Sequence, residues 1–204
     1  MITTALAPHP VPAPLPTPLP TPFRLVVALL TVLTAQPVVS QAHAAQVGKL
    51  APALQQTAQG GVWLGTPTSA GYTLEALRGQ VVIVNFWVYS CINCHNSLPT
   101  LQSWYGKYHA QGLEIIGVHT PEFDSDRPLS NVVAALKRDG VTWPVLQDNA
   151  LNNWHAWSNQ YWPAFYLIDR RGNVRAVHNG EISSRYPGAI PGLENNIKTL
   201  LAER

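Results

Sequence analysis

The stretch VVIVNFWVYSCINCHNSLPTL, residues 81–101, decides the fold that this chain can adopt. It opens with the apolar, β-branched run 81–87. Such a run, when turn residues bound it, is typical of a strand buried on both faces of a parallel sheet. Two cysteines, Cys91 and Cys94, follow, and then a helical pattern that Pro99 interrupts. The stretch therefore predicts a strand, a Cys-x-x-Cys pair and a kinked helix, in that order.

The two cysteines are expected to differ in reactivity. At a helix start, Cys91 meets unpaired backbone N–H groups and the positive end of the helix dipole, and both favour its thiolate. Cys94 lies one turn further along the same face, where it is less exposed but still within bonding distance. We predict that Cys91 attacks and that Cys94 resolves the mixed disulfide. No cofactor beyond the redox-active Cys91–Cys94 disulfide is expected.

The motif CINCH at 91–95 leaves other chemistries open. It matches the C-x-x-C-H signature of covalent haem attachment, although the only Met is Met1. A zinc site would need a fourth ligand besides Cys91, Cys94 and His95, and the usual second Cys or His pair is missing, so no metal is expected. A purely structural disulfide would close too short a loop to stabilise a fold. The buried strand before the motif favours redox chemistry.

The rest of the chain has the apolar patterns of one α/β domain. We expect a small strand or hairpin around 62–64, a helical turn at 74–78, a buried strand at 113–118, a helix from Pro128 to Gly140 with Val132, Val133 and Leu136 on one face, a strand at 143–146, a helix at 151–157, a hairpin of 164–168 with 174–177, and a closing helix through Leu193 and Leu201. Strands alternating with helices predict a central sheet with helices on both faces.

The first 44 residues have a different composition. Every second residue from Pro8 to Pro22 is proline, which prevents regular secondary structure there. Arg24, the apolar run 25–33 and Ala42-His43-Ala44 then form a secretory signal pattern with cleavage after Ala44, and the run is shorter than the ~20 residues of a membrane span. We predict a signal peptide at 1–44, a linker at 45–60 and a folded domain at 61–204, exported to the periplasm or a similar compartment. If the signal stays uncleaved, it would tether the domain to the membrane.

Charge and compartment narrow the function further. Lys and Arg number 13 and Asp and Glu 11, and such a near balance argues against a nucleic-acid partner. Exported compartments are oxidising, so a Cys pair stays disulfide-bonded there unless another protein reduces it.

Several stretches together resemble thioredoxin-fold proteins of the exported TlpA/ResA group, most of all the thioredoxin-like part of DipZ-type cytochrome c biogenesis proteins. The stretches are NFWVYSCINC at 85–94, Pro99, GVHTPEF at 117–123 and NQYWPAFYLID at 159–169. The resemblance implies a thioredoxin fold with a central mixed sheet and thiol–disulfide exchange with protein cysteines. It also implies a link to cytochrome c maturation and a membrane electron donor of the DsbD/CcdA kind.

The resemblance also assigns places to single residues. Trp87 is implied to pack beneath the active site, and Pro163 to be the cis-proline that faces the cysteines. The backbone of Trp162 would then pair with an extended segment of the substrate. If Pro163 is not cis, it would be an edge proline that starts a strand.

Two acids of the wider family are missing here. Asn85 stands where thioredoxin has a buried aspartate, and Ser97 stands where ResA-like proteins have a glutamate. Proton transfer to and from Cys94 therefore needs another group. Glu122 is the first candidate and His119 the second. The alternatives are that Glu122 is a solvated loop acid and that His119 is a hydrogen-bonded strand-end histidine.

These observations predict an exported thiol–disulfide oxidoreductase, working as a reductase on protein substrates. The first alternative is a thiol peroxidase, since related folds use one cysteine on peroxide. A c-type haem protein is the second.

Overall fold

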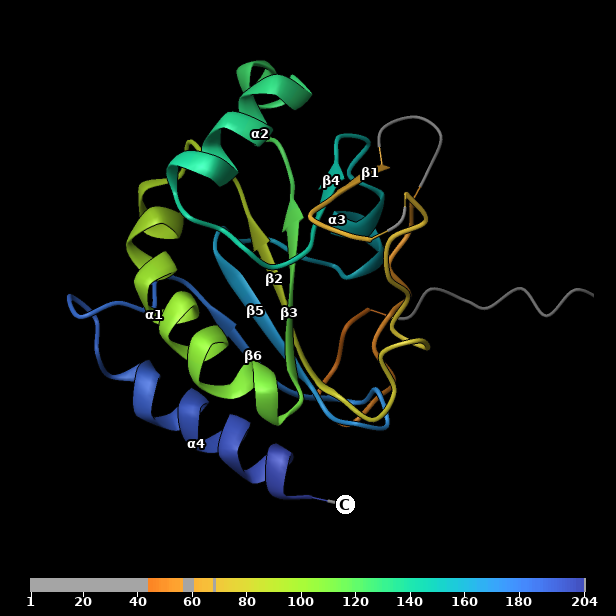
Figure 1. The fold of residues 1–204 in the computed structure, drawn as a ribbon, viewed down its shortest axis with the longest axis vertical. Helices are drawn as coiled ribbons and strands as arrows, with labels where there is room; N and C mark the ends of the chain where they lie inside the picture. The colour runs from red at the N-terminus through yellow and green to blue at the C-terminus, as the bar shows by residue number, and fades with distance from the viewer. Residues whose placement is uncertain (1–43, 57–60, 68, 204) are drawn as a thin grey trace, which may run out of the picture. The chain divides into compact units, whose positions relative to one another are not determined.

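The computed structural model describes residues 44–56, 61–67 and 69–203, so nearly all of the predicted signal peptide lies outside the described residues. The described chain builds a six-stranded sheet in the order β1-β4-β3-β2-β5-β6 (Figure 1). Its elements are β1 (Gly61–Leu64), β2 (Val81–Trp87), α1 (Ile92–Tyr108), the 3-10 turn η1 (His109–Gln111), β3 (Leu113–His119), the 3-10 turn η2 (Asp124–Asp126), α2 (Leu129–Arg138), β4 (Val145–Asp148), α3 (Asn152–Ala156), β5 (Ala164–Ile168), β6 (Val174–Asn179) and α4 (Ala189–Ala202).

The sheet is mixed, as predicted. Strands β2, β3 and β4 run parallel, while β5 and β6 are antiparallel to their neighbours and β1 is antiparallel to β4. The register pairs Trp87 with His119 and Phe86 with Ala164. The end of β2, the end of β3 and the start of β5 therefore meet at one end of the sheet, directly before Cys91.

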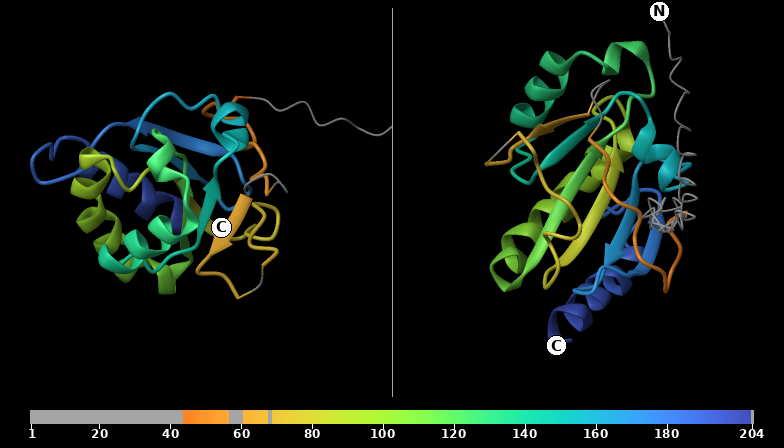
Figure 2. Two further views of the ribbon diagram at one scale, coloured as in Figure 1. Left: turned by 90° about the horizontal axis from the view of Figure 1, so that it is seen from above. Right: turned by 90° about the vertical axis from the view of Figure 1, so that its right-hand side faces the viewer.

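Two hydrophobic clusters cover the two faces of the sheet. One cluster contains the odd-numbered apolar residues of β2 together with Cys94 and the inner sides of α1 and α4. The other contains the even-numbered residues of β2 and the side chains of α3. Figure 2 shows α1 and α4 on one side of the sheet and α3 on the other. The predicted fold, a central mixed sheet with helices on both faces, is confirmed.

The segment that we predicted as a linker contacts the folded domain wherever it is described. Leu54 is buried in the cluster on the α3 face, and Ala51 packs beside it. Leu50 forms a bridge with Asn173, and the N–H of Gln55 donates to the side chain of Asn153 at 2.7 Å. Residues 45–56 therefore serve as a cover for this face of the sheet.

Several local predictions need correction. Pro128 is the N-cap of α2 rather than its first helical residue, since its ψ of 125° is extended. Val133 is 47% exposed, and Ala135 is buried in its place with Val132, because these two positions share the inner side of α2. The strand expected at 143–146 begins at Val145. The single helical turn predicted at 74–78 is present, since the N–H of Leu77 donates to the carbonyl of Thr73 at 3.3 Å. Each error concerns a boundary or a single position, where local patterns are weakest.

None of the helices among the described residues is both long and apolar enough to cross a membrane.

Candidate active site

The two cysteines lie at the start of α1, at the end of the sheet where β2 stops. Cys91 is the N-cap of this helix, and its Sγ accepts the backbone N–H of Cys94 at 3.3 Å. Both side chains are free thiols in this structure. Cys91 is partly exposed, whereas Cys94 is buried at 3% exposure. The structure therefore places an accessible thiol next to an enclosed one, as the spacing predicts.

The surroundings separate the pKa values of the two thiols. The side-chain hydrogen bond from Cys94 lowers the pKa of Cys91 to about 7, and backbone N–H groups of the helix start add to this effect. Burial raises the pKa of Cys94 far above its ordinary value. Cys91 is therefore the thiol that can form the attacking thiolate, while Cys94 keeps its proton until a base removes it.

Trp87 lies beneath this pair, where the resemblance implied it. It is 3% exposed and belongs to the same cluster as Cys94. Its indole approaches β3 at Gly117, where a Cβ atom would lie 3.0 Å from Trp87 Nε1. Glycine at 117 is therefore what lets the indole lie this close to the strand.

Asn85 and Ser97, which replace the family's acids, both have structural partners. The amide of Asn85 is buried and donates to the carbonyl of Ala164 at 3.2 Å, so it ties β2 to β5. The hydroxyl of Ser97 donates to the carbonyl of Asn93 and accepts the N–H of Ile182 at 3.0 Å. Neither side chain can take the proton of Cys94, and both hold backbone in place.

The segment after β6 supports α1 through a carboxylate that sequence reasoning missed. Glu181 is buried at 8% exposure and accepts hydrogen bonds from the side chains of Asn96 and Ser183. It lies beside α1, where its bond to Asn96 is 3.1 Å long. No signal in the sequence marked Glu181, since its partner Asn96 is 85 residues away.

The Trp162–Pro163 peptide bond is cis, as the resemblance implied. The carbonyl of Pro163 accepts the N–H of Gly180 at 2.8 Å, which fixes the loop to the end of β6. Trp162 packs against the cluster that also contacts Cys91 and stacks on Trp154, with ring centroids 4.1 Å apart. Trp162 and Pro163 thus lie at the same end of the sheet as the cysteines.

Glu122 is exposed in the loop that follows β3. Its negative charge raises the pKa of both Cys91 and Cys94, although burial and hydrogen bonds act more strongly on each. The buried carboxylate of Asp126 fixes the loop by accepting the N–H of Glu122 at 3.2 Å and that of Phe123 at 2.9 Å. The structure therefore brings Glu122 within electrostatic reach of the thiols, and its role as a base stays a prediction.

His119, the second candidate base, is completely buried at the end of β3. Its ring is stacked on Tyr89 and lies edge-on to Trp87. Burial lowers the pKa of His119 to about 4, so the ring is neutral at neutral pH. Among the described residues neither ring nitrogen has a hydrogen-bond partner, which differs from the hydrogen-bonded strand-end histidine considered above.

His95, the last residue of the haem-like motif, has structural contacts of its own. Its Nε2 donates to the carbonyl of Tyr89 at 2.6 Å, and its Nδ1 lies 3.6 Å from a carboxylate oxygen of Asp139. Both nitrogens of the ring are thus occupied by protein groups. Across the described part of the chain, no group of three or more His, Cys, Asp and Glu side chains is arranged to hold a metal ion.

Fold and site together define a thioredoxin-like protein with a Cys-x-x-Cys pair at the start of its first long helix. The profile of the AhpC/TSA family matches residues 47–177, and the chain belongs to this family.

Known proteins with similar sequences include DipZ of Mycobacterium bovis, which is 44% identical over 119 residues, or 58% of this chain and 17% of DipZ. The thiol-disulfide oxidoreductase ResA of Halalkalibacterium halodurans is 32% identical over 112 residues, which cover 55% of this chain and 61% of ResA. The chain therefore spans less than a fifth of DipZ and less than two thirds of ResA. Among solved structures, the thioredoxin-like superfamily protein SPOA0173 has a TM-score of 0.63 at 26% identity, covering 76% of this chain and 97% of that one.

These comparisons confirm the predicted relationship with the TlpA/ResA group and with DipZ, and they confirm the thioredoxin fold.

Proposed function

We propose that this protein is an exported thiol–disulfide oxidoreductase that reduces disulfides of protein substrates. The observation that carries the proposal is the pairing of an accessible Cys91 thiol, whose pKa is about 7, with the buried thiol of Cys94, whose backbone N–H donates to the Cys91 sulfur. A nucleophile and a resolving group in this order are what disulfide exchange requires.

The reaction has two steps. The Cys91 thiolate attacks one sulfur of the substrate disulfide, so a mixed disulfide forms and the other substrate sulfur leaves as a thiolate. Cys94 then loses its proton, and its thiolate attacks Cys91 Sγ, which forms the Cys91–Cys94 disulfide and releases the second substrate thiolate. The substrate gains two electrons, and the cysteine pair loses them.

Other residues of the site would assist these steps. Glu122 acts as the base that finally accepts the Cys94 proton at the surface, because its charge already reaches both sulfurs. The backbone of Trp162, next to the cis Pro163, pairs with an extended segment of the substrate.

The acidity of Cys91 supports the reducing direction. A stable thiolate favours the reduced form, so a very acidic nucleophile makes an oxidant: DsbA has a thiol pKa of about 3.5, against about 7 for the reductant thioredoxin. Cys91, with a pKa of about 7, belongs with the second kind.

The similarity to DipZ and ResA supports the remaining parts of the proposal. These are export, a link to cytochrome c maturation, and a membrane electron donor of the DsbD/CcdA kind that returns the pair to the dithiol state. Without such a donor, the pair would stay oxidised outside the cytoplasm.

The test is to trap the partners in the exported compartment. In a Cys94→Ala variant, mixed disulfides through Cys91 should accumulate and should include both substrates and the electron donor. The matched control, Cys91→Ser combined with Cys94→Ala, should trap none. If the single variant traps nothing and the wild-type protein is inert toward a model disulfide, the proposal is wrong.

A second candidate, thiol peroxidase, is favoured by the family assignment alone. Peroxide would then oxidise Cys91 to a sulfenic acid with loss of water, and Cys94 would condense with it to the disulfide. A rate of Cys91 oxidation far above that of a free thiol of the same pKa would support this candidate, and an ordinary rate would exclude it.

A further inference from the structure

The inference concerns His119 and the buried polar atoms around it. His119 is the last residue of β3, and the sheet register sets it opposite Trp87, the residue that packs with Cys94. Odd-numbered residues of β2 and β3 face α1, so the imidazole lies on the same side of the sheet as Cys94.

The imidazole is held by its ring rather than by its nitrogens. Trp87 meets it edge-on with ring centroids 5.4 Å apart, and Tyr89 is stacked on it at 5.5 Å. Tyr89 is fixed in turn, since its hydroxyl donates to the carbonyl of Ser125 at 2.5 Å. Both imidazole nitrogens are buried, and no other residue that the structure describes bonds to them.

Asp126 supplies a third buried polar atom near this ring. Its Oδ2 holds the loop of Glu122, but its Oδ1 is buried without a partner among the described residues, and its charge acts on His119. Nearly all buried polar atoms in proteins are hydrogen-bonded, so buried atoms without a partner among the described residues need an explanation. Here they are the two nitrogens of His119 and Oδ1 of Asp126, whose Oδ2 holds the Glu122 loop.

We propose that His119 relays the proton of Cys94 toward Glu122 at the surface. The inference rests on the proposed function and adds the route that the missing Asp and Glu of the wider family leave open. A neutral imidazole suits this role because it accepts a proton at one nitrogen and releases one from the other. Its low pKa ensures that His119 passes the proton on instead of storing it.

The relay leaves the stoichiometry of the second step unchanged. One nitrogen of His119 takes up the Cys94 proton, and the proton on its other nitrogen passes to Glu122. The Cys94 thiolate attacks Cys91 Sγ, the mixed disulfide breaks, and the departing substrate thiolate takes up a proton from Glu122 or from solvent. His119 ends the cycle neutral.

Ellman's reagent, an aromatic disulfide, separates the two steps in stopped flow. Attack by Cys91 releases the first thionitrobenzoate, and attack by Cys94 releases the second. In His119→Phe, the first phase should stay within about twofold of wild type, and the second should slow at least about tenfold. The unfolding temperature should rise, because two buried nitrogens without partners are removed.

Two further variants keep the test sharp. His119→Gln keeps polar contacts but cannot exchange a proton between two nitrogens, so its second phase should also be slow. His178→Phe is the matched control, since His178 is also stacked on an aromatic ring, Phe165, and also has a buried nitrogen without a partner among the described residues. Both of its phases should match wild type.

The outcomes can be told apart. A second phase of wild-type rate in both His119 variants overturns the relay, and so does equal slowing of both phases, which would mean a role in folding alone. A wild-type protein that releases no thionitrobenzoate counts against the proposed function instead.

Discussion

The two ends of the central sheet differ in how many buried polar atoms lack a hydrogen-bond partner. Nine buried side-chain atoms have no hydrogen-bond partner among the described residues, and most of them lie at the cysteine end: Trp87 Nε1, His119 Nδ1 and Nε2, Asp126 Oδ1, Trp162 Nε1, His178 Nε2 opposite the start of β5, and Asn149 Oδ1 just after β4. At the other end, which we call the hairpin end, only Arg170 Nε is in this state.

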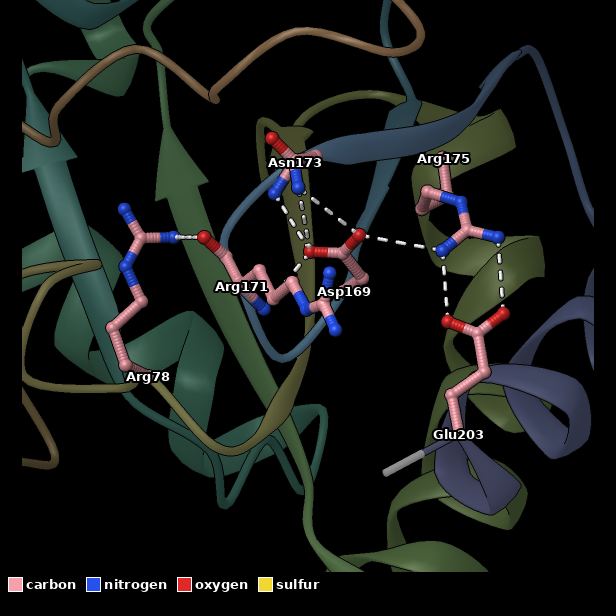
Figure 3. A network of polar contacts seen from close by, with 6 residues as sticks. All are labelled: Arg78, Asp169, Arg171, Asn173, Arg175 and Glu203. Carbon is pink, nitrogen blue, oxygen red and sulfur yellow. Dashed lines mark hydrogen bonds and ion pairs between the residues drawn. The ribbon is translucent and has the colours of Figure 1, made fainter.

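The hairpin end is organised around the buried carboxylate of Asp169, at the turn between β5 and β6. This carboxylate accepts the backbone N–H groups of Arg171 at 2.9 Å and Asn173 at 2.8 Å, and a guanidinium N–H of Arg175 at 3.3 Å (Figure 3). Arg175 also forms a two-pronged ion pair with Glu203, just after α4. This network fastens the end of α4 to the sheet.

This difference indicates that one end of the sheet serves the reaction and the other serves stability. A buried polar group without a partner costs about 1–3 kcal/mol, so a fold keeps such groups mainly where they serve chemistry. At the cysteine end, unpartnered polar groups around the thiols lower the stability of the fold. The hydrogen bonds and ion pairs of Asp169 and Arg175 at the hairpin end help to offset this loss. Changes at the first end should therefore act on rates, and changes at the second on stability.

Cys91→Ser should have the largest effect of all and should act on rate alone. Disulfide exchange should fall by at least about 10³-fold, since a serine hydroxyl is not ionised at neutral pH. The free energy of unfolding should change by less than about 0.5 kcal/mol, because Cys91 is partly exposed. Exchange assays and urea unfolding of the same samples measure both. A large loss of stability would break the contrast between the two ends.

Asp169→Ala is the counterpart at the hairpin end. Removing a buried acceptor of several hydrogen bonds should cost about 2–4 kcal/mol in the free energy of unfolding. The rate of disulfide exchange per folded molecule should stay the same, because the cysteines lie at the opposite end of β2 and β5. A lower rate in the folded fraction would contradict this separation.

The two ends should also lose stability in different pH windows. Burial lowers the pKa of His119 from 6.5 to about 4, so the unfolded chain binds the proton more tightly and stability falls as pH drops through this range, by on the order of 3 kcal/mol. For Asp169, burial raises the pKa, but the hydrogen bonds from Asn173, Arg175 and Arg171 outweigh this, so it lies below 3.8 and stability is lost only under more acidic conditions. Urea unfolding across pH should show the first loss disappear in His119→Phe and the second in Asp169→Asn. A single shared window would refute the assignment.

Glu122→Gln and Glu203→Gln form the smallest matched pair. Loss of the Glu122 charge should lower the pKa of Cys91 by less than about one unit, since this charge is the weakest of the influences on that thiol. Loss of the Glu203 charge should leave that pKa unchanged and cost at most about 1 kcal/mol, as its ion pair with Arg175 is half exposed. Alkylation of Cys91 as a function of pH measures the first effect and thermal unfolding the second. An unchanged Cys91 pKa in Glu122→Gln would place this carboxylate outside the site.

Much of the fold could be predicted from the sequence because its signals are local. The apolar run 81–87, the Cys-x-x-Cys spacing and the hairpin of 164–168 each report their own structure. The resemblance added the cis bond at Pro163, which no local pattern requires. The contacts of the segment before β1 could not be predicted, since Leu54 is a single apolar residue whose neighbours in the core lie far along the chain.

The site was less predictable for the same physical reason. The reactivity of Cys91 follows from its place at the start of a helix, which the sequence indicates. The burial of His119 without hydrogen-bond partners could not be predicted, because it depends on Trp87, Tyr89 and a loop that only the folded chain brings together. The roles of Asn85 and Ser97 depend on backbone partners 79 and 85 residues away.

The contacts of Ser97 limit which side chains can stand at this position. Position 97 is 1% exposed, and its hydroxyl holds the backbone of Ile182 on α1. A glutamate there, as in ResA-like proteins, would need room that the segment after β6 now occupies. A Ser97→Glu substitution alone should therefore not restore such a base, since the chain from Glu181 to Ser183 would have to move with it. A group that takes up the Cys94 proton then has to come from another element on the same face of the sheet, such as β3 and the loop after it.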